Sequence, residues 1–173
     1  SSLRYFTPGF ERNVSDDMLI KLADKGGVIH INFGSSFVSQ KSREYDKKLQ
    51  GYILENLAKE KKDLVKTDLP EDQVSFFRKE YLSANPYPYA SINDVIDHID
   101  RVVQLVGIDH VGIGSDFDGV GDTLPVDLKD VSMYPNLVTG LLKRGYNQPD
   151  IKKILSENTL RVWREAETYA ESH

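Results

Sequence analysis

VGIGSDFDG, at residues 111–119, is the stretch that decides the fold. The β-branched residues Val111 and Ile113 favour a short buried strand, and two carboxylates and a glycine follow it directly. Asp116 should therefore lie at the carboxyl end of this strand. In α/β folds with parallel strands, the catalytic side chains gather at that end. Asp116 is accordingly the first candidate for a catalytic residue.

A second strand is predicted earlier in the chain, over residues 28–33. This segment reads VIHINF and is almost entirely apolar, which is typical of a parallel strand covered on both faces. His30 is the exception, and we interpret it as a buried structural histidine with a hydrogen-bond partner. Asn32, Phe33 and Gly34 come at the carboxyl end of the strand, so they are candidates for the rim of a binding pocket.

Helical patterns occupy the segments around the two strands. Ser15 is expected to cap one helix, and Ser91 caps the clearest one, which has apolar residues at i, i+3, i+4 and i+7. Further helices are predicted after Pro135 and after Asn147. His98 falls outside the apolar stripe of the helix that begins after Ser91, so we expect its side chain at the surface or at the edge of the stripe.

Residues 40–84 have a different composition, rich in lysine and glutamate. Apolar residues at helical spacing predict one or two exposed amphipathic helices here, interrupted at Pro70. The charged cluster at residues 59–62 is interpreted as a solvated face. Because a connection of this length is unusual in a compact domain, we interpret residues 40–84 as a helical insertion.

The order of these elements is helix, strand, helical insertion, helix, strand and helices. Such alternation predicts an α/β fold with parallel strands. The sequence contains two convincing strands, however, and two parallel strands cannot close a barrel or form a stable sheet alone. We therefore expect either that another chain completes the sheet or that this sequence is the later part of a longer one.

Composition excludes several classes of function. The 173 residues carry a formal net charge of -5, and no block of lysine and arginine suggests binding to nucleic acid. No apolar run is long enough for a membrane span, and neither a signal peptide nor an anchor is visible, which leaves the localisation unknown. Cysteine is absent, so disulfides and thiolate chemistry are excluded.

Several blocks of the sequence together resemble one known family, the membrane (renal) dipeptidase family of zinc peptidases. The strongest match is residues 107–119, and the blocks occur in the order that the family has. They cover most of the chain outside residues 40–84, and as a set they are highly specific. The other matching blocks are residues 12–17, 26–33, 97–100, 130–135 and 157–162.

This resemblance implies the C-terminal portion of a TIM-type (β/α)8 barrel, with residues 1–173 forming part of a single metal-dependent dipeptidase domain. It also implies a cofactor of two zinc ions. The family's metal ligands all lie upstream of the motif matched by Arg12-Asn13, and Ser1-Ser2 resemble the pair that follows the last ligand. We therefore expect none of the metal ligands in this chain, which would supply the last two barrel strands. The expected partners are the N-terminal half of the same barrel and, as often in the family, a second copy in a homodimer.

The resemblance also implies roles for individual residues. The residue matching Asp116 is a catalytic acid and base, and the one matching Arg12 binds the carboxylate of the dipeptide substrate. Asn32, Phe33 and Gly34 match the wall of the substrate pocket. Without the resemblance, Asp116 could equally be a turn or capping carboxylate, and Arg12 a member of a surface salt bridge.

Two alternatives remain open at this point. An apolar strand ending in Asp-x-Asp-Gly also resembles the nucleophile motif of haloacid-dehalogenase-type phosphatases, with Asp116 as nucleophile and Mg²⁺ as cofactor. That motif normally opens its domain, whereas here it comes late. The other alternative is an inactive half-barrel fragment that needs a partner chain. The favoured hypothesis is a zinc-dependent metallodipeptidase whose complete form is active and in which this chain alone is inactive.

Overall fold

A computed structural model describes residues 1–60 and 70–172 of the chain. Within those residues there are two strands, β1 (Ile29–Asn32) and β2 (Val111–Ser115), which pair in parallel. Ile29 lies opposite Val111, and the pairing becomes irregular between Ile31 and Asn32. The predicted pair of parallel strands, and with it the mixed α/β class, is confirmed.

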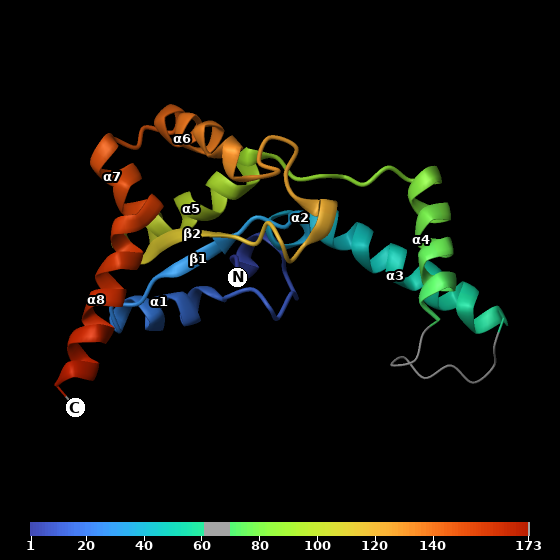
Figure 1. Ribbon diagram of the computed structural model, residues 1–173, viewed down its shortest axis with the longest axis horizontal. Helices are drawn as coiled ribbons and strands as arrows, with labels where there is room; N and C mark the ends of the chain where they lie inside the picture. The colour runs from blue at the N-terminus through green and yellow to red at the C-terminus, as the bar shows by residue number, and fades with distance from the viewer. Residues whose placement is uncertain (61–69, 173) are drawn as a thin grey trace. The chain divides into compact units, whose positions relative to one another are not determined.

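The chain divides into two compact units, the first of which comprises Ser1–Gln40 and Tyr89–His173. In this unit α5 packs against both strands, and α1 lies beside α5 (Figure 1). The C-terminal α8 runs past the start of β2, and the π-helical segment that precedes α8 contacts β2. The helices of this unit are α1 (Asp16–Asp24), α2 (Ser35–Val38), α5 (Ile92–Val106), α6 (Tyr134–Lys143), α7 (Gln148–Lys152) and α8 (Asn158–Glu171), with the π-helical segment at Lys153–Glu157.

The predicted helix starts are confirmed by their capping contacts. The Ser15 hydroxyl accepts a hydrogen bond from the backbone N–H of Met18, and Pro135 occupies the first turn of α6. Ser91 and Asn147 each form a reciprocal capping box with an aspartate three residues later. These contacts satisfy N–H groups that a helix leaves without partners at its first turn. The local sequence therefore determines where the helices begin.

The core of this unit lies between α5 and the two strands. Val95, Ile96, Ile99 and Val102 form the apolar stripe of α5 and are completely buried. They pack in one cluster with residues of the strands, of α1 and of α6. The apolar stripe that the 3.6-residue period of α5 produces thus covers one face of the sheet.

His98 corrects one sequence-based expectation, because its side chain is completely buried rather than exposed. Its Nδ1 accepts a hydrogen bond of 2.9 Å from the backbone N–H of Leu3, and its Nε2 lies 3.2 Å from the carbonyl of Val38. The ring of Phe6 covers it at a centroid distance of 4.6 Å. Two segments distant in sequence therefore cover a second side of α5, which its own apolar periodicity does not reveal.

The second unit, Lys41–Pro88, contains most of α3 (Gln40–Glu60) and all of α4 (Glu71–Ala84). Its helices share a small core of their own, formed by Leu49, Ile53, Leu57 and Phe77. Pro70 directly precedes α4, as its fixed φ favours. Of the charged cluster at residues 59–62, Lys59 is exposed, whereas residues 61 and 62 lie outside the described residues. None of the helices described here, the long α3 included, has the length and apolar character that crossing a bilayer requires.

Candidate functional site

The end of β2 is bent in a way that directs Asp116 toward β1. The register pairs Ile31 with Ile113 but Asn32 with Ser115, so Gly114 is an extra residue on β2. A Cβ on Gly114 would lie 2.9 Å from the carbonyl oxygen of His30, and glycine allows this close approach. Such a bulge changes the direction in which the following side chains point.

The two residues after the bulge adopt an uncommon backbone conformation. Ser115 has a φ of 52° and Asp116 a φ of 72°, in the left-handed region that residues other than glycine rarely occupy. The Ser115 hydroxyl contacts the hydroxyl of Tyr134 at the start of α6, a contact that holds this turn in place. Surrounding contacts are needed to maintain such a conformation, and it is frequent at functional sites.

Asp116 is half-buried and is contacted on two sides. Its Oδ2 accepts a hydrogen bond from the side-chain amide of Asn32, which joins the carboxyl ends of β1 and β2. On the other side, a Cβ on Gly119 would overlap Oδ1 of Asp116, so the carboxylate occupies space that a larger residue would take. The structure therefore brings Asn32 and Asp116 into direct contact.

The other two residues of the predicted pocket rim are buried. Phe33 has no exposed surface, and its ring lies 5.9 Å from that of Phe117 and 6.4 Å from that of Tyr134. Its backbone N–H is already bonded to the carbonyl of Ser115. Gly34 is buried too, and its N–H donates to the side-chain oxygen of Asn32 at 2.8 Å. The side chain of Phe33 thus supports the site from the core.

Arg12 lies in a segment that its neighbour Asn13 fixes in place. Asn13 is 1% exposed, accepts a hydrogen bond from the backbone of Ser2 at 2.9 Å and donates to the carbonyl of Phe37 at 2.8 Å. The Arg12 side chain is exposed, and its guanidinium carbon lies 4.8 Å from the centroid of the Phe37 ring. Because Phe37 belongs to α2, which follows β1 directly, Arg12 lies on the same side of the unit as the end of β1.

Asp116 and Arg12 have a common neighbour. Both side chains lie within electrostatic reach of the same residue, Ser1.

The described part of the chain contains no group of three or more histidine, aspartate or glutamate side chains that could hold a metal ion. His30 is half-buried and its Nε2 lies 2.9 Å from the hydroxyl of Thr159, while burial lowers its pKa. His110 uses its Nδ1 to contact the carbonyl of Gly27 at 2.8 Å. Each of these histidines thus uses a ring nitrogen in a contact with another part of the protein.

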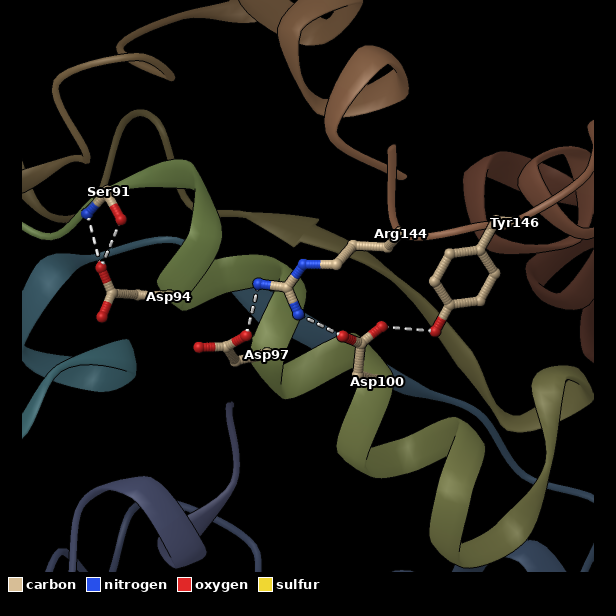
Figure 2. A network of polar contacts seen from close by, with 6 residues as sticks. All are labelled: Ser91, Asp94, Asp97, Asp100, Arg144 and Tyr146. Atoms are coloured by element: carbon tan, nitrogen blue, oxygen red, sulfur yellow. Dashed lines mark hydrogen bonds and ion pairs between the residues drawn. The ribbon is translucent and has the colours of Figure 1, made fainter. Parts of the chain in front are cut away.

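A second polar cluster, shown in Figure 2, joins α5 to the segment between α6 and α7. Arg144 donates to Asp97 at 2.7 Å and to Asp100 at 2.6 Å, and the Tyr146 hydroxyl donates to Asp100 at 2.7 Å. Burial, together with the bond to Asp100, raises the pKa of Tyr146 well above its usual value. Since every member already has a partner, we interpret this cluster as structural.

Sequence reasoning missed two contributors to the site. Gly119 follows Asp116 closely in the sequence, but its contact with the carboxylate of Asp116 depends on the fold of the turn. Tyr134 carries no sequence signal for its contact with Ser115, which lies 19 residues earlier. The spacing Asp-x-x-Gly was the one available hint, because a glycine so soon after a candidate catalytic residue can mark a close approach.

Comparison with known proteins identifies the class. Residues 5–173 match the family described as membrane dipeptidase (peptidase family M19). An uncharacterized dipeptidase of Schizosaccharomyces pombe is 29% identical over 170 residues, which cover 98% of this chain and 30% of that protein. The chain therefore belongs to the M19 membrane dipeptidase family, and the resemblance found in the sequence is confirmed.

Solved structures agree with this assignment. The probable dipeptidase PvdM from Pseudomonas aeruginosa aligns with a TM-score of 0.73 and 31% identity, over 94% of this chain and 42% of that one. A metallopeptidase from Rhodobacter sphaeroides, liganded with a phosphinate mimic of the dipeptide L-Ala-D-Ala, aligns with a TM-score of 0.59 and 25% identity, over 91% and 32%. The chain thus spans between 30% and 42% of the length of these relatives.

Proposed function

We propose that the complete protein hydrolyses dipeptides in a zinc-dependent reaction, and that this chain supplies the catalytic carboxylate Asp116 and the substrate-binding Arg12. The observation that carries the proposal is the position of Asp116 at the carboxyl end of β2, with Arg12 beside the helix that follows β1, in a chain of the M19 family. The dipeptide mimic bound by the Rhodobacter sphaeroides relative supports a dipeptide as the substrate class.

Asp116 would move the proton in this reaction. A carboxylate beside the scissile bond can accept a proton from the attacking water and return it to the leaving amine. Asp116 is half-buried, so it can meet a substrate while Asn32 holds one of its oxygens. The neighbouring Asp118 is exposed and belongs to the following turn, and we assign it no catalytic role.

Arg12 would bind the free carboxylate at the C-terminal end of the dipeptide. A guanidinium group matches a carboxylate with two parallel hydrogen bonds. The contact of the guanidinium with the Phe37 ring and the anchoring of Asn13 limit the conformations of Arg12. Restricting the side chain in advance reduces the entropy lost on binding.

The site is completed by parts of the barrel outside this chain. We infer that β1 and β2 are the last two strands of a (β/α)8 barrel, that residues 40–84 are an insertion, and that residues 1–173 belong to one barrel domain. Within the described residues the outer edges of both strands are unpaired. An apolar pocket of about 570 Å³ between β1 and α8, lined by Val28 and Trp163 among others, offers a surface for the preceding half.

The resemblance to the family implies that residues outside this chain would hold the two zinc ions. The described residues form no metal-binding group. The residues of this chain would then orient the substrate and move a proton at Asp116. The barrel half that carries the ligands is the partner that the proposal requires, and a homodimer remains a further prediction. We expect residues 1–173 alone to be inactive.

The decisive test is replacement of Asp116 in the full-length protein. Asp116→Ala should lower kcat by about 10²- to 10⁴-fold, the range for loss of a general acid–base group, and leave the zinc content unchanged. Asp118→Ala is the matched control and should retain activity. Normal turnover by the Asp116→Ala protein would refute the catalytic assignment.

Arg12 is tested with two substrates that differ at one end. Arg12→Ala should raise KM for a free dipeptide by about 10- to 100-fold, because hydrogen bonds to a charged group are worth about 1.5–3 kcal/mol. The same dipeptide with an amidated C-terminus lacks the carboxylate and should be affected much less. Equal effects on both substrates would remove the role proposed for Arg12.

A further inference from the structure

Asn32 was predicted from the sequence as part of the pocket wall, but its contacts point to a different role. It is 8% exposed, and both ends of its amide group are bonded within the protein. We propose that Asn32 is a positioning residue, which holds the carboxylate of Asp116 in its reactive orientation. This inference rests on the proposed function and assigns the device that keeps the catalytic group in place.

The orientation of the Asn32 amide follows from its partners. The backbone N–H of Gly34 is a donor, so the side-chain atom that faces it at 2.8 Å must be the oxygen. The NH₂ group of Asn32 is consequently directed at Oδ2 of Asp116. An amide fixed in this way presents a donor and no acceptor to the carboxylate, and it can therefore hold Oδ2 of Asp116 in place.

Asp116 is confined on its other side as well. Its Oδ1 lies against Gly119, where a Cβ would overlap it, and the backbone of Ser115 and Asp116 is held in the left-handed region. The carboxylate thus lies between a hydrogen-bond donor on β1 and the backbone of its own turn. Removing the donor frees one side, and the carboxylate can then rotate away from the substrate.

The bulge supplies the register on which this contact depends. In a regular register without the bulge, Asn32 would lie opposite Gly114 instead of Ser115, and Asp116 would be shifted along the strand relative to the amide. A shift of one residue also exchanges the two faces of a strand. The irregularity between Ile31 and Asn32 therefore serves to bring a residue of β1 to the carboxylate that follows β2.

The experiment uses two variants of the full-length protein. Asn32→Asp keeps an oxygen for the N–H of Gly34 and replaces the donor by a like charge, while Asn32→Leu keeps the approximate volume and removes both polar atoms. Each should lower kcat by about 10- to 100-fold, the cost of a misplaced reacting group, and change KM by less than about twofold. A change in KM alone would mean that Asn32 contacts the substrate, and it would overturn the proposal.

A double-mutant cycle separates positioning from an independent effect. In the Asp116→Ala protein, whose residual rate is the reference, neither Asn32 variant should reduce kcat further, because the group that Asn32 positions is gone. Losses that multiply in the double variant would overturn the proposal. Full activity of both single Asn32 variants beside an impaired Asp116→Ala protein would refute the positioning role alone, whereas an active Asp116→Ala protein would refute both that role and the proposed function.

Asn158 provides the matched control for a purely structural asparagine. It is 3% exposed, and its amide donates to the carbonyls of Ile108 and Val111 near the start of β2. Asn158→Ala should lower the melting temperature and leave kcat per folded molecule unchanged. The Asn32→Asp protein should instead lose kcat per folded molecule, whatever the change in its melting temperature. A loss of stability in the Asn32 variants without a loss of kcat would place Asn32 in the same structural class and contradict the inference.

Discussion

His98 should make the stability of the protein depend on pH between about 6.5 and about 4. Its buried ring accepts a hydrogen bond from Leu3 at Nδ1, so the proton of the neutral ring is on Nε2, facing the carbonyl of Val38. Burial lowers the pKa of His98 from 6.5 to about 4, although Val38, Asp97 and Asp94 oppose this effect. A second proton would have to go to Nδ1, where it would meet the N–H of Leu3.

The sign and size of the effect follow from the two pKa values. As pH falls, the unfolded chain takes up a proton near 6.5 and the folded protein only near 4, so protonation favours the unfolded state in between. At about 1.4 kcal/mol per pH unit, the stability present above pH 6.5 falls by about 2 kcal/mol at pH 5 and by about 3 kcal/mol near pH 4. Below pH 4 the contribution of His98 is fully lost.

Urea unfolding of the full-length protein at a series of pH values measures this loss. Carboxylates also titrate in this range, so the comparison is with His98→Asn, whose side-chain oxygen can occupy the place of Nδ1 and keep the bond to Leu3. The variant should be less stable than the wild type at pH 7, and the difference should shrink by about 3 kcal/mol toward pH 4. Parallel pH profiles for the two proteins would refute the reasoning.

Two further predictions concern the site and the cluster of Figure 2. Gly119→Ala places a Cβ against Oδ1 of Asp116 and should lower kcat by about 10- to 100-fold with little change in stability, whereas Gly51→Ala, where a Cβ has open space, should leave kcat unchanged. Arg144→Ala leaves two carboxylates of α5 without their cation and should lower the free energy of unfolding by about 1 kcal/mol, as measured by urea unfolding. That loss should be smaller at about 1 M salt, since the ion pairs are partly exposed; an unchanged free energy would show that the pairs contribute nothing.

The parts of the fold that could be predicted from the sequence are those that local physics determines. The helix that starts after Ser91 contains both its capping residue and its apolar repeat within its own segment. The structure confirms the helix start and the buried face that these two features predict. The strand at residues 111–115 could be predicted for the same reason. Its β-branched residues and the turn that follows them are adjacent in the sequence. The placement of Asp116 at its carboxyl end was available from that pattern alone.

His98 shows what local patterns cannot reveal. Its position on α5 lies off the apolar stripe, so the helix alone predicts exposure. The side chain is buried because Leu3 and Phe6, more than 90 residues earlier, and the end of α2 all pack against it. Long-range contacts of this kind leave no mark on the periodicity of either partner. Predicting them requires knowledge of which segments meet.

The same limit explains why the site was only half predictable. Asn32 and Asp116 were each recognised as lying at a strand end, but their roles depend on a contact between residues 84 positions apart. That contact depends on the one-residue irregularity of the sheet, which in turn requires a glycine where the backbone of β2 approaches His30. A regular register would have put both residues at the same sheet edge without joining their side chains. Both residues could be recognised in the sequence as lying at strand ends. The role of Asn32 as a partner of Asp116, however, follows only from the register of the two strands.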